Sequence, residues 1–169
     1  MKKILFSFLL LSINLFCNAQ TTLLKSGTKI IVANQNPLHS DGMEQAYFII
    51  QNDVTGENNT VLIKQGTAVN MNIERKKAGS WGKPGFMSVT ALNTTSIDGQ
   101  IINLIGNYSQ QGEDRKTLAW IVAGGGCLFI WGVGILAGFI VTGENVEIPS
   151  QYLMMNIRSS TDYNISISK

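Results

Sequence analysis

The sequence predicts an all-β fold, a small antiparallel barrel or sandwich with a glycine-rich apolar helical insertion near the C-terminus. Short segments of β-branched and apolar residues recur along the chain, separated by Gly, Asn, Asp and Pro. No helix-period amphipathic pattern occurs outside the N-terminus and one apolar stretch, so we expect no helical layer. That stretch, Leu118 to Thr142, contains no charged residue, and strand-like sequence resumes directly after it.

The expected strands follow one another with turn-forming segments between them. The middle of segment 46–54 is apolar on both faces, so we expect this strand near the centre of the sheet. Val69, Met71 and Ile73 alternate with asparagines, which predicts one buried and one solvated face. The expected strands are 28–32, 46–54, 60–73 with a break at Gly66, 86–92, 100–105, 145–148, 151–157 and 163–168, and the expected loops are 33–42, 55–59, 78–85, 96–99 and 109–116.

A short motif recurs and predicts repeated corners between strands. Its copies are 24–30 (LKSGTKI), 63–69 (IKQGTAV) and a degenerate 148–154 (IPSQYLM). Each copy has an apolar residue, a short polar turn and then alternating apolar residues. Gly27 and Gly66 permit a positive φ in such a turn, and Gly99 has the same role in segment 96–99. Because the third copy lies beyond the apolar stretch, we expect the C-terminal segment to join the same sheet.

The N-terminus has the layout of a secretory signal peptide, residues 1–19. Two lysines precede an apolar run from Ile4 to Phe16, and small or polar residues follow it, so we expect cleavage after Ala19. A retained anchor helix is disfavoured because the apolar run is short, and acylation at Cys17 is disfavoured because a bulky residue precedes it. We therefore expect an exported protein of the periplasm or cell envelope.

Charge and composition exclude several function classes. Loss of Lys2 and Lys3 lowers the basic count from 13 to 11, equal to the 11 acidic residues, and a neutral chain is a poor partner for nucleic acid. Cys127 alone would remain in the mature chain, so no internal disulfide can form. His39 is the only histidine, and its neighbours Ser40 and Asp41 do not make a catalytic triad by adjacency. We predict no catalytic, cofactor or metal site.

The apolar stretch is long enough to cross a membrane. Its 25 residues would span about 37 Å as a helix, against ~30 Å for the hydrocarbon core of a bilayer. Three interpretations stay open: a single transmembrane helix, a helical hairpin or re-entrant insertion bent at 124–126, and a buried hairpin in a soluble domain. Arg115 and Lys116 would place the N-terminal flank in the cytoplasm, which conflicts with export. We favour the hairpin, whose two ends lie on the same side.

The candidate membrane and assembly residues belong to this stretch. Gly134 and Gly138 form a GxxxG pair, which lets two helices approach closely in lipid, and tryptophans can anchor a segment at the membrane interface. The full set is Trp120, Gly124, Gly125, Gly126, Trp131, Gly134 and Gly138. The expected organisation is a signal peptide (1–19), a β-domain in two parts (20–116 and 143–169) and the apolar insertion (117–142).

Several short motifs between Leu23 and Gly112 occur in a familiar order. They are Leu24-Lys25-Ser26-Gly27-Thr28, His39-Ser40-Asp41-Gly42, Ile49 to Val54, Val61 to Thr67, Ile97-Asp98-Gly99 with Ile101 to Leu104, and Gly112. This order resembles the C-terminal β-barrel domain of the outer-membrane scaffold subunit of type IV secretion and conjugation machines. In that family a leucine-isoleucine-proline-x-glycine-serine corner and a proline-aspartate-glycine turn sit at comparable intervals. A helical antenna inserted late in the barrel crosses the outer membrane.

The resemblance implies a barrel fold and a role in envelope assembly. The family's proline-rich periplasmic arm and cytoplasmic helix have no counterpart in this sequence, so we do not expect the chain to span both membranes or to secrete. We predict a non-enzymatic envelope protein anchored or assembled through its apolar segment, with the membrane and other proteins or its own copies as partners. The alternative is a soluble periplasmic binding module with that segment in its core. Nothing in the sequence indicates a small-molecule substrate.

Overall fold

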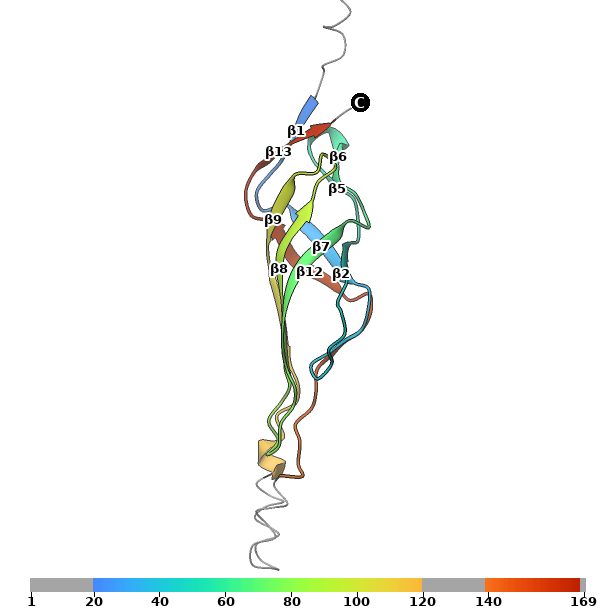
Figure 1. The fold of residues 1–169 in the computed structure, drawn as a ribbon. Helices are drawn as coiled ribbons and strands as arrows, with labels where there is room; N and C mark the ends of the chain where they lie inside the picture. Colours follow the sequence, from blue (N-terminus) through green and yellow to red (C-terminus); the bar gives the residue numbers. More distant parts are fainter. Residues whose placement is uncertain (1–19, 120–138, 168–169) are drawn as a thin grey trace, which may run out of the picture.

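Six antiparallel strands close into a barrel in the computed structural model, which describes residues 20–119 and 139–167 (Figure 1). The order around the barrel is β8-β7-β4-β2-β12-β9, and β9 returns to β8 to close the ring. The strands are β2 (Lys29–Asn34), β4 (Phe48–Ile50), β7 (Ala68–Lys76), β8 (Phe86–Thr95), β9 (Ile101–Ile105) and β12 (Leu153–Ser159). The predicted all-β antiparallel barrel is confirmed, whereas the predicted helical insertion lies mostly outside the described residues.

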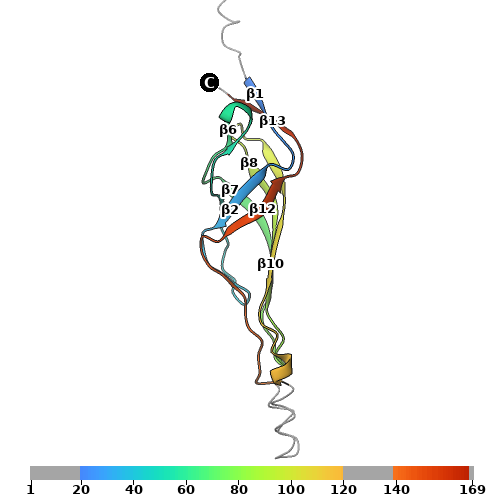
Figure 2. The same cartoon turned by 180° about the vertical axis from the view of Figure 1, so that it is seen from behind.

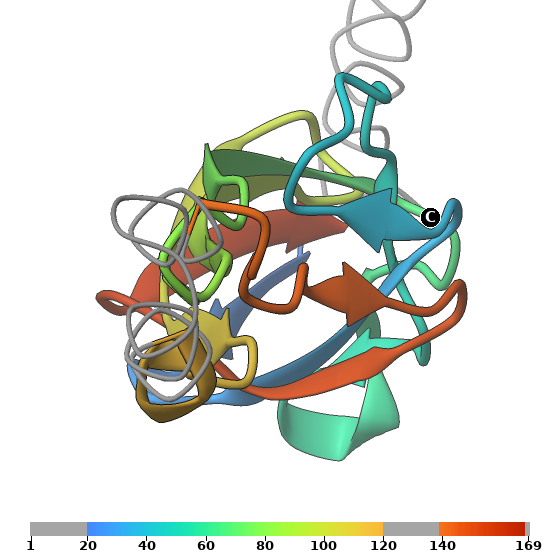
Figure 3. The same cartoon turned by 90° about the horizontal axis from the view of Figure 1, so that it is seen from below.

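The remaining strands extend the barrel at its two ends. At one end β1 pairs with β13, and at the other end β10 continues from β9 along β8 (Figures 1 and 2). Figure 3 shows the molecule from this second end, with the strands arranged in a ring. The bounds are β1 (Gln20–Leu24), β3 (Leu38–His39), β5 (Val54–Thr55), a 3₁₀ helix (Glu57–Asn59), β6 (Val61–Ile63), β10 (Asn107–Gln111), β11 (Glu147–Ile148) and β13 (Tyr163–Ile167).

The barrel core follows from alternation along each strand. In β9, Ile102 and Leu104 are buried, whereas Ile101 and Ile105 are exposed, because successive side chains of a strand point to opposite faces. β12 lies in the ring between β2 and β9, although it follows the apolar stretch in sequence. The core includes Ile30, Val32, Phe48, Ile50, Val69, Met87, Val89, Ile102, Leu104, Met154 and Ile157.

The recurring motif builds three similar corners. Gly27 has φ 79° and Gly66 has φ 82°, and in each corner the following threonine donates both its N–H and its hydroxyl to a lysine carbonyl three residues earlier. In the third copy Gln151 takes the corresponding position with φ 61°. Gly99 has φ 85° in the turn between β8 and β9. The corners therefore share one backbone geometry even where the third lacks glycine.

Several boundaries differ from those predicted. Segment 46–54 forms two strands, because the chain turns at 51–53 and the Asp53 carboxylate accepts a hydrogen bond of 2.7 Å from the Gln65 N–H. β1 precedes the first expected strand. β2 and β3 occupy parts of the expected loop 33–42, and β10 occupies part of the expected loop 109–116. β10 has no apolar alternation, because most of its side chains are exposed. It is held to β8 by main-chain pairing at the edge of the sheet.

Candidate functional site

Three chain segments run side by side away from the barrel, to the end of the molecule opposite β1 and β13 (Figures 1 and 2). They are residues 77–85, 112–119 and 139–145, which we call the stalk. The second segment leads into residues 120–138, and the third leads out of them, so the stalk is where the apolar stretch joins the β-domain. Residues 116–119 form one helical turn at the tip.

Backbone hydrogen bonds join the three stalk segments. The Gly82 N–H donates to the Val141 carbonyl at 2.9 Å, and the Gly82 carbonyl accepts from the Arg115 N–H at 3.0 Å. Further towards the barrel, the Gly85 N–H donates to the Glu144 carbonyl and the Gly85 carbonyl accepts from the Gly112 N–H, both at 2.9 Å. Segment 77–85 therefore bonds to both of the other segments, and these two also meet directly, since the Glu144 N–H donates to the Glu113 carbonyl at 3.4 Å.

Glycine is required where these backbones approach. A Cβ added at Gly112 would collide with the main-chain oxygen of Glu144, and one at Gly143 would collide with the main-chain oxygen of Lys83. A Cβ at Gly82 would meet the carbonyl group of Arg115. The obstructing atoms are main chain, which cannot rotate away as a side chain can. The close packing of the stalk therefore depends on these glycines.

Apolar side chains are exposed at the tip of the stalk. The rings of Trp81 and Phe139 meet edge to face, with centroids 5.3 Å apart and an interplanar angle of 76°. Ile140 is 81% exposed, Phe139 is 54% exposed and Leu118 is 49% exposed. This contact joins the loop between β7 and β8 to the C-terminal part of the apolar stretch. The exposed apolar residues of the tip therefore belong to the two ends of that stretch.

Charged side chains of segments 112–119 and 139–145 pair with one another. Arg115 lies 3.4 Å from a Glu113 carboxylate oxygen and 3.7 Å from one of Glu144, so it pairs with both flanks of the apolar stretch. Lys116 binds Asp114 at 2.8 Å, and this hydrogen bond holds the pKa of the Asp114 carboxyl below its usual value. These side chains are exposed, so the pairs contribute little to stability.

The predicted assembly residues at 120, 124–126, 131, 134 and 138 lie outside the described residues. The structure instead brings together their flanks, and it adds stalk residues that the sequence analysis did not select: Trp81, Gly82, Gly112, Phe139 and Gly143. The spacing of Gly79, Gly82 and Gly85 is the one signal in the sequence that could have indicated a closely packed segment. The turn glycines 27, 66 and 99 lie outside the three stalk segments, in the turns between β1 and β2, β6 and β7, and β8 and β9.

Metal-ligand geometry, helix length and comparison with known proteins identify no further functional site among the described residues. Within residues 20–119 and 139–167, no cluster of three His, Cys, Asp or Glu side chains is placed to hold a metal ion, and no helix is long and apolar enough to cross a membrane. His39 lies in β3, opposite Glu147 of β11. No protein-family model matches the chain, and no curated protein is significantly similar to it in sequence.

Proposed function

We propose that this protein is a non-enzymatic component of the cell envelope. In this proposal a signal peptide, residues 1–19, directs export. The apolar insertion, residues 117–142, attaches the β-barrel to a membrane surface, and its part beyond the stalk, residues 120–138, forms a helical hairpin or re-entrant segment. There the barrel assembles with other proteins or with further copies of itself.

The observation that carries the proposal is the meeting of the two flanks in the stalk. A single helix of 25 residues would separate its ends by about 37 Å, on opposite sides of a bilayer. The Arg115 guanidinium and the Glu144 carboxylate, which flank the apolar stretch, are instead 3.7 Å apart. This proximity supports an insertion that leaves and re-enters the domain on the same side.

Two further features support attachment at the tip. Leu118, Phe139 and Ile140, which belong to the two ends of the stretch, are exposed apolar residues of the stalk. A barrel interrupted late by an apolar insertion is also the arrangement that the resemblance to the type IV secretion scaffold implies. The barrel has its own apolar core, built from all six strands.

Membrane fractionation of the full chain tests the proposal. We expect the mature protein to sediment with membranes and to stay there after a carbonate wash. A variant in which 120–138 is replaced by a short Gly-Ser linker should move to the soluble fraction, because it lacks the apolar segment. It should stay folded, because the stalk retains its own hydrogen bonds. Circular dichroism of the variant provides the control for folding. Recovery of the full mature chain in the soluble fraction without detergent would contradict the proposal and would favour the soluble binding module.

A further inference from the structure

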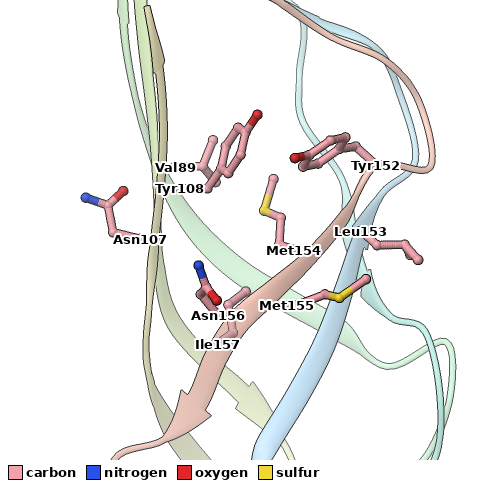
Figure 4. Close-up of a pocket in the computed structure, with 9 residues that line it drawn as sticks. All are labelled: Val89, Asn107, Tyr108, Tyr152, Leu153, Met154, Met155, Asn156 and Ile157. Carbon is pink, nitrogen blue, oxygen red and sulfur yellow. The ribbon is translucent and has the colours of Figure 1, made fainter.

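The wall of the barrel opens on one side, between β10 and β12. On the side of the opening that is farther from the stalk, β9 pairs with β12. Ile105 lies opposite Arg158, and Leu104 lies opposite Ser159. Gly106 marks the point of divergence: a Cβ there would lie 2.8 Å from the Asn156 carbonyl oxygen, so the two backbones touch. Beyond Gly106 the chain continues as β10 along β8 alone. A cavity of about 300 Å³ lies in the opening (Figure 4).

The edge of β10 that faces this opening carries main-chain groups without a strand partner. The Ala91 N–H donates to the Gly106 carbonyl, and the Gly112 N–H donates to the Gly85 carbonyl, both at 2.9 Å. In an antiparallel ladder the hydrogen-bonded pairs alternate, so between these two bonds Tyr108 and Gln110 bond to β8. Residues 107, 109 and 111 therefore direct their N–H and C=O groups away from β8, and β10 pairs with no second strand in the described chain.

This edge also lacks the features that usually prevent strand pairing. Exposed edges are commonly protected by lysine, proline or a short length. β10 is five residues long, with the sequence Asn-Tyr-Ser-Gln-Gln, and contains neither a charge nor a proline. Asn107, Ser109 and Gln111 are exposed. The strand is therefore free to accept another strand along this edge.

The cavity beside the edge is uncharged and largely apolar. Val89, Met154 and Ile157 line its inner side, Asn156 contributes an amide, and none of its described lining residues is charged (Figure 4). The Tyr108 and Tyr152 rings meet at one end, with centroids 5.0 Å apart. Burial, together with the neighbouring Tyr152, raises the pKa of Tyr108 to about 12. The Tyr108 hydroxyl donates to the Gln110 side chain at 3.0 Å.

We propose that β10 and this cavity bind an extended segment of a partner protein as an added strand, with an uncharged apolar or aromatic side chain of that segment in the cavity. Pockets for small organic ligands usually measure about 300–1,000 Å³, so this cavity is at the lower limit for such a ligand. A small ligand would also leave the edge of β10 unpaired. An extended peptide satisfies both features, because its main chain pairs with the edge and alternate side chains enter the pocket.

The probe is a phage-displayed library of random linear peptides, selected on the full mature chain in detergent and then synthesised for affinity measurements. We expect selected peptides with few charges and with apolar residues at alternate positions. On binding, amide hydrogen exchange at residues 107, 109 and 111 should slow by about tenfold or more, because these N–H groups gain partners.

Substitutions at the edge and in the cavity give matched tests. Ser109→Pro removes an outward N–H and keeps the ladder to β8, whereas Ser109→Ala keeps both. We expect Ser109→Pro to weaken peptide binding by about tenfold or more and Ser109→Ala to change it by less than about twofold, as for one lost hydrogen bond. Asn156→Trp, at an exposed position of the cavity, should block binding independently. Thermal unfolding checks that each variant is folded.

Three results would overturn the inference. One is that no peptide is selected above the background obtained with Asn156→Trp, and another is binding that both substitutions leave unchanged. The third is concentration-dependent self-association of the wild type that Ser109→Pro abolishes while no peptide binds, which would assign the edge to a second copy of the chain. None of these results depends on membrane attachment, so failure here is distinguishable from failure of the proposed function.

Discussion

Ile102→Ala is expected to lower the free energy of unfolding by about 2–5 kcal/mol, the usual cost of truncating a fully buried isoleucine to alanine. Ile102 is 0% exposed and lies in β9, the strand that closes the ring between β8 and β12. Its removal leaves a cavity where three strands meet, and the total stability of a domain is only about 5–15 kcal/mol. Urea denaturation of the mature chain in detergent, followed by the circular dichroism of the β-sheet, measures the change.

Ile101→Ala is the matched control for this prediction. Ile101 precedes Ile102 in the same strand but is 62% exposed, so its truncation should change stability by less than about 0.5 kcal/mol. A one-residue change of register would exchange the inward and outward faces of β9. Equal losses for the two variants, or a larger loss for Ile101→Ala, would therefore contradict the barrel described here.

The second large effect is expected in the stalk, from Gly112→Ala. The new Cβ would collide with the main-chain oxygen of Glu144, so segments 112–119 and 139–145 must separate. Separation breaks the hydrogen bonds of Gly85 with Glu144 and with Gly112. At about 1 kcal/mol or more for each bond, we expect amide exchange at Gly85 and Gly112 to accelerate by roughly 30- to 100-fold. Hydrogen exchange followed by mass spectrometry measures this, while barrel amides stay protected.

Gly79→Ala provides the control within the same stalk. A Cβ at Gly79 would lie 3.5 Å from the nearest atom, in the Lys83 side chain, which is ordinary van der Waals contact. This variant should exchange like the wild type throughout the stalk. If both variants open the stalk equally, general flexibility of the glycines and not close backbone packing would explain the effect.

Much of the fold could be predicted because burial leaves a pattern in the sequence. The alternation of Val69, Met71 and Ile73 with exposed asparagines is visible in β7, and the Gly-Thr corners at Gly27 and Gly66 are visible as a repeat. β10 was missed because an edge strand with mostly exposed side chains carries no alternation, and its pairing is a main-chain property. The split of segment 46–54 depends on a side-chain cap from Asp53, which apolar patterning does not report.

The candidate site could be predicted only in outline. Length and absence of charge identify the apolar stretch, and the strand sequence after it indicates an insertion. The stalk itself depends on main-chain contacts between residues far apart in sequence, such as Gly85 with Gly112 and Glu144. Composition does not specify such partners. The pairing of Arg115 with Glu144 across the insertion is likewise visible only in three dimensions.

Sidedness of the two flanks tests the central claim most directly. The background chain carries Cys17→Ser and Cys127→Ser. In it, Asp114→Cys and Glu144→Cys report the two flanks. Met43→Cys, at a fully exposed site, reports the barrel. We expect a membrane-impermeant maleimide to label all three positions from the same side of sealed, oriented membrane vesicles. Labelling of Asp114→Cys and Glu144→Cys from opposite sides would contradict an insertion whose two ends meet in the stalk.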